Sequence, residues 1–408
     1  METTVFPIRK SANKHFFVDS TNKPFFYNAD TCWKLFWEFT SDEAEFYLKN
    51  RKETGFTVIQ VQLLPYRAYQ CNRYGDNPFN ARGDMTKPNE AYFKHVDRIL
   101  EMASELGLGM LIAPVWLSKW EQEWYRIFNA ENAASYGRYL AARYKRFSNV
   151  IGWIHGGDDD AIELHDAIRI CGSAMNQEAP YQFNTFHGYV KGGWQFFRNE
   201  KWYDLYMAYA YDYQDALRQL TEAYGLTPAN PVFLGETHYE RNFGITSSLL
   251  RKYAYTSVLL GTAGQAYGHN DIWMSTCFWK QALKAEAGLN MGCLKRFFCS
   301  LGWHKLTPDF DHLFANGLSA SDQSNVPAAT AMDGSTAVIY IPNRSIVTVD
   351  LSHLKKELKA YWCDPTSCKY HNADLGLRQD TDLMNNKCCF STPGYNMGGD
   401  DDWLLFFM

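Results

Sequence analysis

The chain has 408 residues, a mass of 47.1 kDa and a formal net charge of −5. A single α/β barrel takes about 250 residues, so the length predicts one such domain and a smaller second one. The charges are interspersed without a basic stripe, which disfavours nucleic acid as a partner.

Strand and helix patterns alternate along the first three quarters of the chain. Residues 5–29 read as short extended segments with a turn-rich stretch between them. Eight buried strands are expected in total: at 25–30, 55–65, 108–116, 150–158, 181–187, 204–211, 231–236 and 264–269. Helical patterns lie between them at 43–54, with Ser41 as a cap, 90–106, 131–147, 161–176, 214–224 and 249–260. This alternation predicts a closed parallel (β/α)8 TIM barrel over residues 1–305.

The last hundred residues have a different pattern. After residue 306, short alternating segments are spaced by turns, at 336–341, 345–350, 358–362 and 403–407. Short strands with little helix predict a small antiparallel β-sandwich domain over residues 306–408. Its expected role is packing against the barrel.

The ten cysteines are too few and too scattered for a disulfide framework. Free thiols indicate a reducing compartment. The first ten residues lack the apolar core of a signal peptide, and no run of about 18 apolar residues occurs. We therefore expect a soluble, cytoplasmic protein without a membrane partner.

Two carboxylates end two of the predicted strands. Asp158 ends the fourth strand and Glu236 the seventh, so both project at the carboxyl-terminal face of the barrel. Two opposed carboxylates are what glycoside hydrolysis requires, with Asp158 as acid/base and Glu236 as nucleophile, and a separation of about 5 Å gives retention. Two structural alternatives stay open: any of the aspartates 158–160 could cap the next helix, and Glu236 could pair with Arg241.

Other polar and aromatic residues at strand ends are candidate sugar contacts. They are Asp30, Trp33, Gln62, Trp116, His155, His187, Tyr211, Tyr239, His269 and Trp273. A metal site built from His155, His187, His238 and His269 is the competing chemistry, but no H-x-H or H-x-x-x-H pair marks a strand or helix. The turns after the strands also lack glycine-rich nucleotide signatures. We expect neither a metal nor another cofactor.

Several motifs together resemble glycoside hydrolase family 140, the apiosidases. These are Asn28-Ala29-Asp30-Thr31-Cys32-Trp33, Gly55-Phe56-Thr57-Val58-Ile59-Gln60, Trp153-Ile154-His155-Gly156-Gly157-Asp158, Gly235-Glu236 and Tyr267-Gly268-His269. Residues 337–365 resemble the small domain, named for collagen binding, that follows the barrel in this family. The resemblance implies a retaining exo-hydrolase that removes a terminal apiofuranose from rhamnogalacturonan II or from flavonoid apiosides, with Asp158 and Glu236 at the catalytic positions of the motifs.

The chain also departs from the family pattern. Cys32 stands where alanine is common, and residues 207–211 read Met-Ala-Tyr-Ala-Tyr where a Gln-Ser-Gly-His type of sequence is expected. These departures leave the sugar open, so another furanosidase, similar to arabinofuranosidases, is an alternative. A carbohydrate- or collagen-binding protein without catalysis is the alternative from a different class. The oligomeric state is left open.

Overall fold

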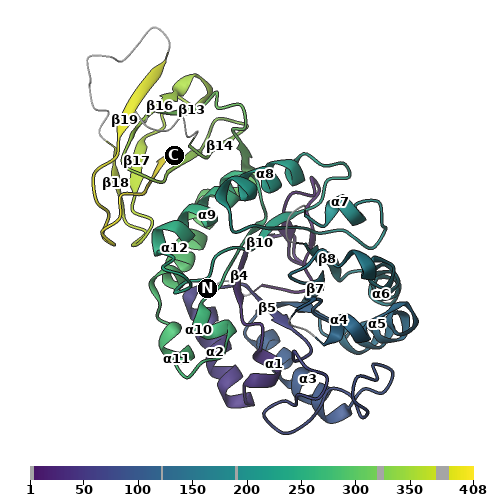
Figure 1. Cartoon of the computed structure of the whole chain (residues 1–408). Helices are drawn as coiled ribbons and strands as arrows, with labels where there is room; N and C mark the ends of the chain where they lie inside the picture. The colour runs from purple at the N-terminus through teal and green to yellow at the C-terminus, as the bar shows by residue number, and fades with distance from the viewer. Residues whose placement is uncertain (1–3, 121–122, 189–191, 319–325, 374–385) are drawn as a thin grey trace.

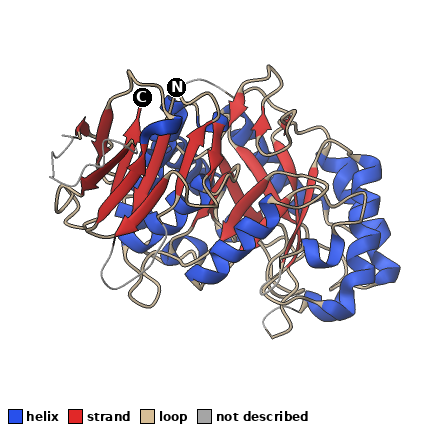
Figure 2. Cartoon of the chain, turned by 90° about the horizontal axis from the view of Figure 1, so that it is seen from above, coloured by secondary structure: helices blue, strands red, loops and turns tan. Residues whose placement is uncertain are grey.

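The computed structural model describes residues 4–120, 123–188, 192–318, 326–373 and 386–408. Figure 1 shows a ring of strands and helices and, beside it, a smaller group of strands coloured green to yellow that contains the carboxyl terminus. Figure 2 shows the same two parts from above, with the strands of the smaller part beside the barrel.

Eight parallel strands form the barrel. They are β4 (Tyr27–Thr31), β5 (Val58–Gln62), β6 (Gly109–Ala113), β7 (Val150–Gly156), β8 (Phe183–His187), β9 (Tyr206–Tyr209), β10 (Val232–Glu236) and β11 (Gly264–Tyr267). Their hydrogen-bonded order is β8-β7-β6-β5-β4-β11-β10-β9. At the seam between β8 and β9, the backbone N–H groups of Asp204 and Leu205 donate to the carbonyl of Asn184. The predicted (β/α)8 barrel is confirmed.

Helices cover the outside of the barrel. The longer ones are α2 (Ser41–Thr54), α3 (Glu90–Glu105), α5 (Ala130–Tyr144), α6 (His165–Glu178), α8 (Tyr213–Tyr224), α9 (Ser247–Leu259) and α12 (Glu286–Leu301). Shorter ones are α1 (Leu35–Glu38), α4 (Trp124–Ile127), α7 (Trp194–Phe197), α10 (Asn270–Trp273) and α11 (Trp279–Ala282). The cap of α2 is Thr40 and not the expected Ser41, because Thr40 forms a reciprocal capping box with Glu43. Within the described ranges, no helix is both long and apolar enough to cross a bilayer.

A small amino-terminal sheet closes one end of the barrel. Its strands are β1 (Arg9–Lys10), β2 (Phe17–Val18) and β3 (Pro24–Phe25). Phe17 packs on Phe183, the first residue of β8, with ring centroids 5.1 Å apart. The sheet therefore covers the interior core at the amino-terminal ends of the strands, and the opposite end carries the polar residues.

The carboxyl-terminal part is a sandwich of two antiparallel sheets, as predicted. One sheet contains β12 (Leu306–Pro308), β14 (Ala328–Ala331), β15 (Ala337–Ile341), β20 (Trp403–Phe407), β17 (Ala360–Cys363) and β18 (Tyr370–Asn372). The other contains β13 (Ala315–Leu318), β16 (Ile346–Asp350) and β19 (Lys387–Ser391). On β15, Ile339 faces the core between the sheets, whereas Val338 packs with helices of the barrel. Burial on both faces explains why β15 and β20 are apolar throughout.

Ionic and covalent links join the sandwich to the barrel. Arg251 of α9 is fully buried and donates to Asp402 at 2.7 and 2.8 Å. Cys293 of α12 forms a disulfide with Cys368, which lies 75 positions further along the chain. The expectation of free thiols is therefore wrong for these two cysteines, and the inference of a reducing compartment loses its basis, because disulfides persist in oxidising compartments.

Candidate active site

A pocket of about 230 Å³ lies at the carboxyl-terminal ends of the barrel strands. Eight of the residues expected at the site line it: Trp33, Gln62, Trp116, Asp158, Tyr211, Glu236, Tyr239 and Trp273. Three further lining residues, Tyr66, Tyr209 and Asn242, had not been singled out from the sequence. Tyr209 had a signal, because it is two residues from Tyr211 on the same strand pattern.

Strand alternation explains how Gln62 and Tyr209 reach the pocket. On β5, Val58 faces the barrel interior, and Gln62, four residues later, points to the same face of the strand. On β9, Met207 faces the interior and Tyr209 follows it two residues later. Side chains of one parity point to one face of a strand, so the inward series continues into the pocket.

Glu236 is an exception that depends on a β-bulge. Phe233 of β10 faces the interior, so strict alternation would point Gly235 inward and Glu236 outward. The register shifts instead: Leu234 pairs with Ala208 and Glu236 with Tyr209, which leaves Gly235 as the extra residue. A bulge of this kind re-aims the following side chain, here the Glu236 carboxylate, into the pocket. Glycine suits the position because a Cβ there would lie 2.3 Å from Cε of Met207.

Both carboxylate oxygens of Glu236 have a partner. Nε2 of His187 lies 2.8 Å from Oε2, and the Tyr211 hydroxyl donates to Oε1 at 3.2 Å. The alternative ion pair with Arg241 is not formed; His187 takes that place. Burial, followed by the charge of Glu236, raises the pKa of the Tyr211 phenol. Tyr211 is therefore a neutral hydrogen-bond donor over the whole physiological range.

Asp158 is the only one of the three consecutive aspartates that lines this pocket. Its Oδ2 accepts a 2.9 Å hydrogen bond from the indole of Trp116. Asp159 accepts from the backbone N–H of Lys119, and the carbonyl of Asp160 contacts the ring of His165. None of the three caps α6 or the 3-10 turn before it, so the capping alternative is not what the structure shows.

The glycines before Asp158 serve backbone packing. A Cβ on Gly156 would lie 2.6 Å from the carbonyl of His187, and one on Gly157 would lie 2.2 Å from the carbonyl of Leu117. Gly156 also has a φ of +89°, which L side chains rarely adopt. These close approaches bring the ends of β7 and β8 together and position Asp158 beside His187.

Indole and phenol rings form one wall of the pocket. The ring centroids of Trp33 and Trp116 are 5.0 Å apart, and those of Tyr239 and Trp273 are 5.8 Å apart. Trp33 donates from its indole nitrogen to the Tyr239 hydroxyl at 2.7 Å. Rings held in this way present apolar faces and a few fixed polar groups, the combination that typifies small-molecule sites.

The remaining expected contacts lie elsewhere. The side chains of Asp30 on β4 and His155 on β7 point away from the barrel interior. Asp30 binds Tyr47 and Arg51 of α2, and His155 binds Asn184. His269 caps α10 by accepting from the backbone of Asp271. Counting alternation from Tyr27 and Ala29 would have excluded Asp30, but not His155, because a register shift on β7 leaves Ile151 and Ile154 both in the interior core. Among the described residues, no group of three or more His, Cys, Asp or Glu side chains is arranged to hold a metal.

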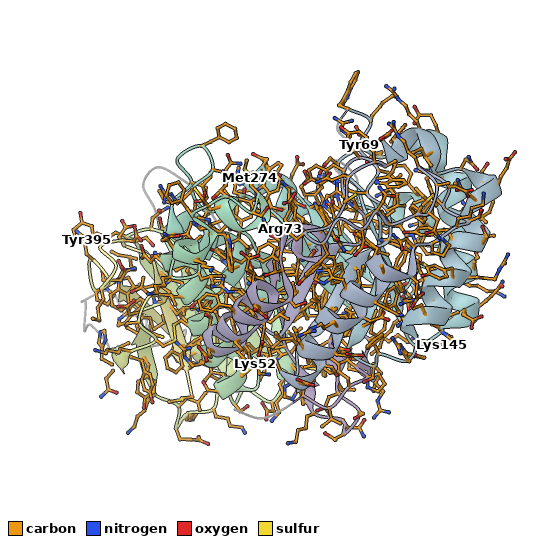
Figure 3. The ribbon with its side chains drawn as sticks, turned by 90° about the horizontal axis from the view of Figure 1, so that it is seen from below. Lys52, Tyr69, Arg73, Lys145, Met274 and Tyr395 are labelled. Carbon is orange, nitrogen blue, oxygen red and sulfur yellow. A yellow bond between two sulfur atoms is a disulfide. The ribbon has the colours of Figure 1, made fainter. Side chains whose placement is uncertain are left out.

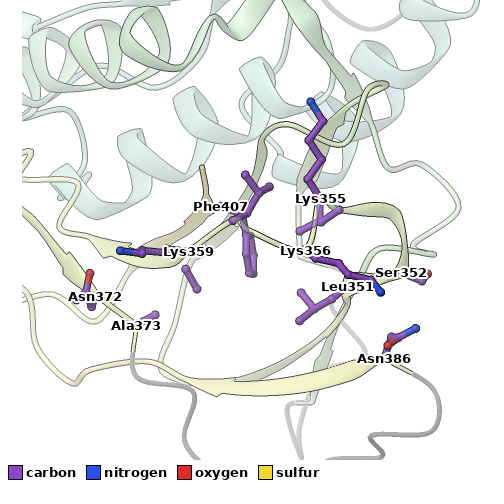
Figure 4. Close-up of a pocket in the computed structure, with 12 residues that line it drawn as sticks. Leu351, Ser352, Lys355, Lys356, Lys359, Asn372, Ala373, Asn386 and Phe407 are labelled. Atoms are coloured by element: carbon purple, nitrogen blue, oxygen red, sulfur yellow. The ribbon is translucent and has the colours of Figure 1, made fainter.

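A second cavity, of about 610 Å³, lies in the sandwich (Figure 4). Lys355, Lys356 and Lys359 line it together with apolar side chains such as Leu351 and Phe407. Its described lining contains no carboxylate. This cavity therefore offers no pair of carboxylates for glycoside hydrolysis.

Comparisons with known proteins identify the family and the fold. The family model described as "Apiosidase-like, catalytic domain" matches residues 11–305. A structure described as "Glycoside hydrolase" has 23% identity and a TM-score of 0.86, covering 100% of this chain and 98% of that one. A family 5 glycoside hydrolase from Bacteroides vulgatus has 21% identity and a TM-score of 0.86, covering 100% and 95%. At these identities the structural likeness shows the fold alone, and no curated protein matches the sequence. On the family match, the chain belongs to the apiosidase-like family and is a glycoside hydrolase.

Proposed function

We propose that the enzyme is a retaining exo-hydrolase that releases a terminal apiofuranose, with Glu236 as nucleophile and Asp158 as acid/base. The observation that carries this proposal is that both carboxylates line one pocket. Its volume of about 230 Å³ is below the roughly 300 Å³ at which drug-sized ligand sites begin. A pocket of that size suits one terminal sugar.

The proposed reaction is a double displacement. Glu236 attacks the anomeric carbon while Asp158 gives its proton to the glycosidic oxygen, so the carbon–oxygen bond to the leaving group breaks as the glycosyl ester forms. Asp158, now a carboxylate, removes a proton from water, which attacks the same carbon and returns the bonding pair to Glu236. Inversion occurs twice, so the configuration is retained.

Two conservative variants test these roles. Glu236→Gln and Asp158→Asn keep size and polarity but remove the nucleophile and the proton donor, so each should abolish turnover of an apioside while circular dichroism stays unchanged. Asp159→Asn is the matched control, because Asp159 binds the backbone of Lys119 outside the pocket. If both site variants hydrolyse as fast as the parent, the proposed site is wrong.

Stereochemistry is tested by methanolysis. In aqueous methanol a retaining enzyme gives the methyl apioside with the configuration of the substrate, and NMR of that stable product identifies it. Inverted product would contradict the double displacement.

The identity of the sugar is tested by the product: release of arabinose without apiose would assign the enzyme to another kind of furanosidase. Binding of glycosides or collagen with no hydrolysis would favour the non-catalytic alternative.

A basic groove beside the pocket favours an acidic leaving group. It has a volume of about 330 Å³ and is lined by Arg67, Tyr69, Arg82, Lys119, Trp120, Glu123 and Arg126. Arg82 pairs with Glu123 and Lys119 with Glu163, whereas no ion pair within the described residues includes Arg67 or Arg126. Trp120 is 85% exposed, which leaves its ring available for stacking, whereas Tyr69 is 61% exposed and the guanidinium of Arg82 lies over its ring, 5.0 Å from the centroid. Figure 3 shows Tyr69 and Met274 toward one side of the molecule, and Lys52 and Lys145 toward the other.

Chain neighbours connect this groove to the catalytic pocket. Arg67 follows Tyr66 of the pocket, and Lys119 donates to Asp159, the neighbour of Asp158. A leaving group with a carboxylate, as in a pectic chain, would be bound there in preference to a neutral flavonoid. The test compares one uronate-linked apioside with its methyl ester. Arg67→Gln with Arg126→Gln should raise KM for the acid only, and Lys145→Gln, on a distant surface, should not.

A further inference from the structure

His187 binds Glu236, the proposed nucleophile, by a hydrogen bond. The backbone carbonyl at the other ring nitrogen determines which nitrogen carries hydrogen. The side chain ends β8 and is fully buried. Nδ1 lies 2.8 Å from the carbonyl oxygen of Gly157, and Nε2 lies 2.8 Å from Oε2 of Glu236. The imidazole is packed between Trp116 and Tyr209, with ring centroids at 4.6 and 4.2 Å. Contacts with two aromatic rings and at both nitrogens hold the imidazole in this orientation.

The number of protons in the pair follows from these contacts. A carbonyl oxygen only accepts hydrogen bonds, so Nδ1 of His187 must carry hydrogen. The contact between Nε2 and Glu236 then requires one more proton, because a bare nitrogen lone pair and a carboxylate repel each other. Either the pair is imidazolium and carboxylate, or it is neutral imidazole and carboxylic acid.

The charges around the ring decide between these two states. Two carboxyl groups face the ring: Glu236 lies on β10, and Asp158 lies in the segment after β7. The neutral phenols of Tyr209, on β9, and of Tyr211, two residues later, also face it. Burial alone would lower the pKa of His187, but the hydrogen bond to Glu236 and the charges of Glu236 and Asp158 outweigh it and raise the pKa. The hydrogen-bonded carboxylate of Glu236 thus favours the imidazolium, and Asp158 adds to this only while it is ionised, not while it holds the proton of the acid.

We propose that His187 is a positioning residue that carries its proton on Nε2 and keeps Glu236 as a carboxylate aimed at the anomeric carbon. The inference rests on the proposed role of Glu236. When the glycosyl ester forms, His187 keeps its proton and donates to the same oxygen. When water cleaves the ester, the bonding pair returns to Glu236, and the cation stabilises that returning charge. No proton passes between the two residues.

Nuclear magnetic resonance of ring-labelled histidine tests the pair without any substrate. In the parent enzyme near neutral pH, His187 should show imidazolium nitrogen shifts with two bound hydrogens. In Glu236→Gln it should become the neutral tautomer with hydrogen on Nδ1 only, because burial then acts without the carboxylate that accepts the hydrogen bond from Nε2. His155 is the internal reference, since burial lowers its pKa to about 4 and keeps it neutral. A neutral His187 in the parent, or the same charge in both proteins, would overturn the proposal.

Kinetics supply a second test. His187→Gln keeps an uncharged donor for Glu236 and should lower kcat about 10²-fold, the loss typical of one electrostatic donor. The acid limb of kcat/KM should also move to higher pH, because Glu236 loses its cationic partner. Tyr211→Phe removes a neutral donor from the other oxygen, so it should lower kcat and move that limb in the same direction, but by less than the loss of the cation does. An unmoved limb in His187→Gln would contradict the charge assignment. Absence of apiosidase activity together with the expected resonance result would instead refute only the proposed function.

Discussion

The indole of Trp116 donates a 2.9 Å hydrogen bond to Oδ2 of Asp158, so a residue that follows β6 orients the carboxyl that follows β7. The same ring packs against Trp33 at 5.0 Å and against His187 at 4.6 Å between centroids. Trp116 therefore contacts the proposed acid/base, the aromatic wall and the residue that holds the proposed nucleophile.

Trp116→Phe should lower kcat/KM for an apioside. The substitution keeps an aromatic ring but removes the donor to a carboxyl, and hydrogen bonds to charged groups contribute about 1.5–3 kcal/mol, or roughly 10- to 100-fold. Trp33→Phe is the control, because that indole donates to the neutral hydroxyl of Tyr239. Steady-state kinetics on both variants, with thermal unfolding to check the fold, gives the comparison. Equal losses would assign the effect to packing alone.

Gly235→Ala should reduce both activity and stability. The added Cβ would lie 2.3 Å from Cε of Met207 and 2.8 Å from the ring of Phe233, so the bulge that directs Glu236 must shift. Overpacking of this kind costs about 1–3 kcal/mol. Gly225→Ala is a matched control, since its Cβ would meet nothing closer than 3.7 Å. Urea unfolding and kcat measure the two effects. Full activity in Gly235→Ala would show that the bulge does not position Glu236.

The sequence predicted the barrel well because its strands and helices have strong, different periods. Asp158 and Glu236 were found because carboxylates at strand ends stand out. The bulge at Gly235 was not predictable, because pairing Glu236 with Tyr209 depends on the neighbouring strand. Cys293 and Cys368 were missed for a related reason: the packing of the sandwich on α12 brings together residues 75 positions apart.

Acid should destabilise the fold through His155. Burial lowers its pKa from 6.5 to about 4. Between these pH values the unfolded chain binds a proton that the folded protein does not, so stability falls as pH falls, by about 1.4 kcal/mol per pH unit. Asp30 opposes this, because burial raises its pKa to about 6 and the folded state then binds the extra proton.

The contribution of His155 is therefore measured by difference. His155→Gln keeps an N–H donor for Asn184 and should reduce the slope of unfolding free energy against pH by about 1.4 kcal/mol per unit from pH 6.5 to 4. The exposed His371 provides the control variant, His371→Gln, which should leave the slope unchanged. Parallel curves for parent and His155→Gln would show that His155 titrates normally in the folded state.

Reduction of the bond between Cys293 and Cys368 should lower the melting temperature. The cross-link closes a long loop and ties α12 of the barrel to the sandwich. Native disulfides of this kind contribute about 2–4 kcal/mol. Arg251 and its buried partner Asp402 remain to hold the two parts together, so the reduced enzyme should stay folded at room temperature.

Two serine variants provide the controls. Cys293→Ser should have the melting temperature of the reduced parent and should not respond to reductant. Cys299→Ser changes an exposed thiol on the same helix and should behave like the parent. Peptide mapping without reductant identifies the cross-linked pair directly, and two alkylated thiols at these positions would contradict the bond.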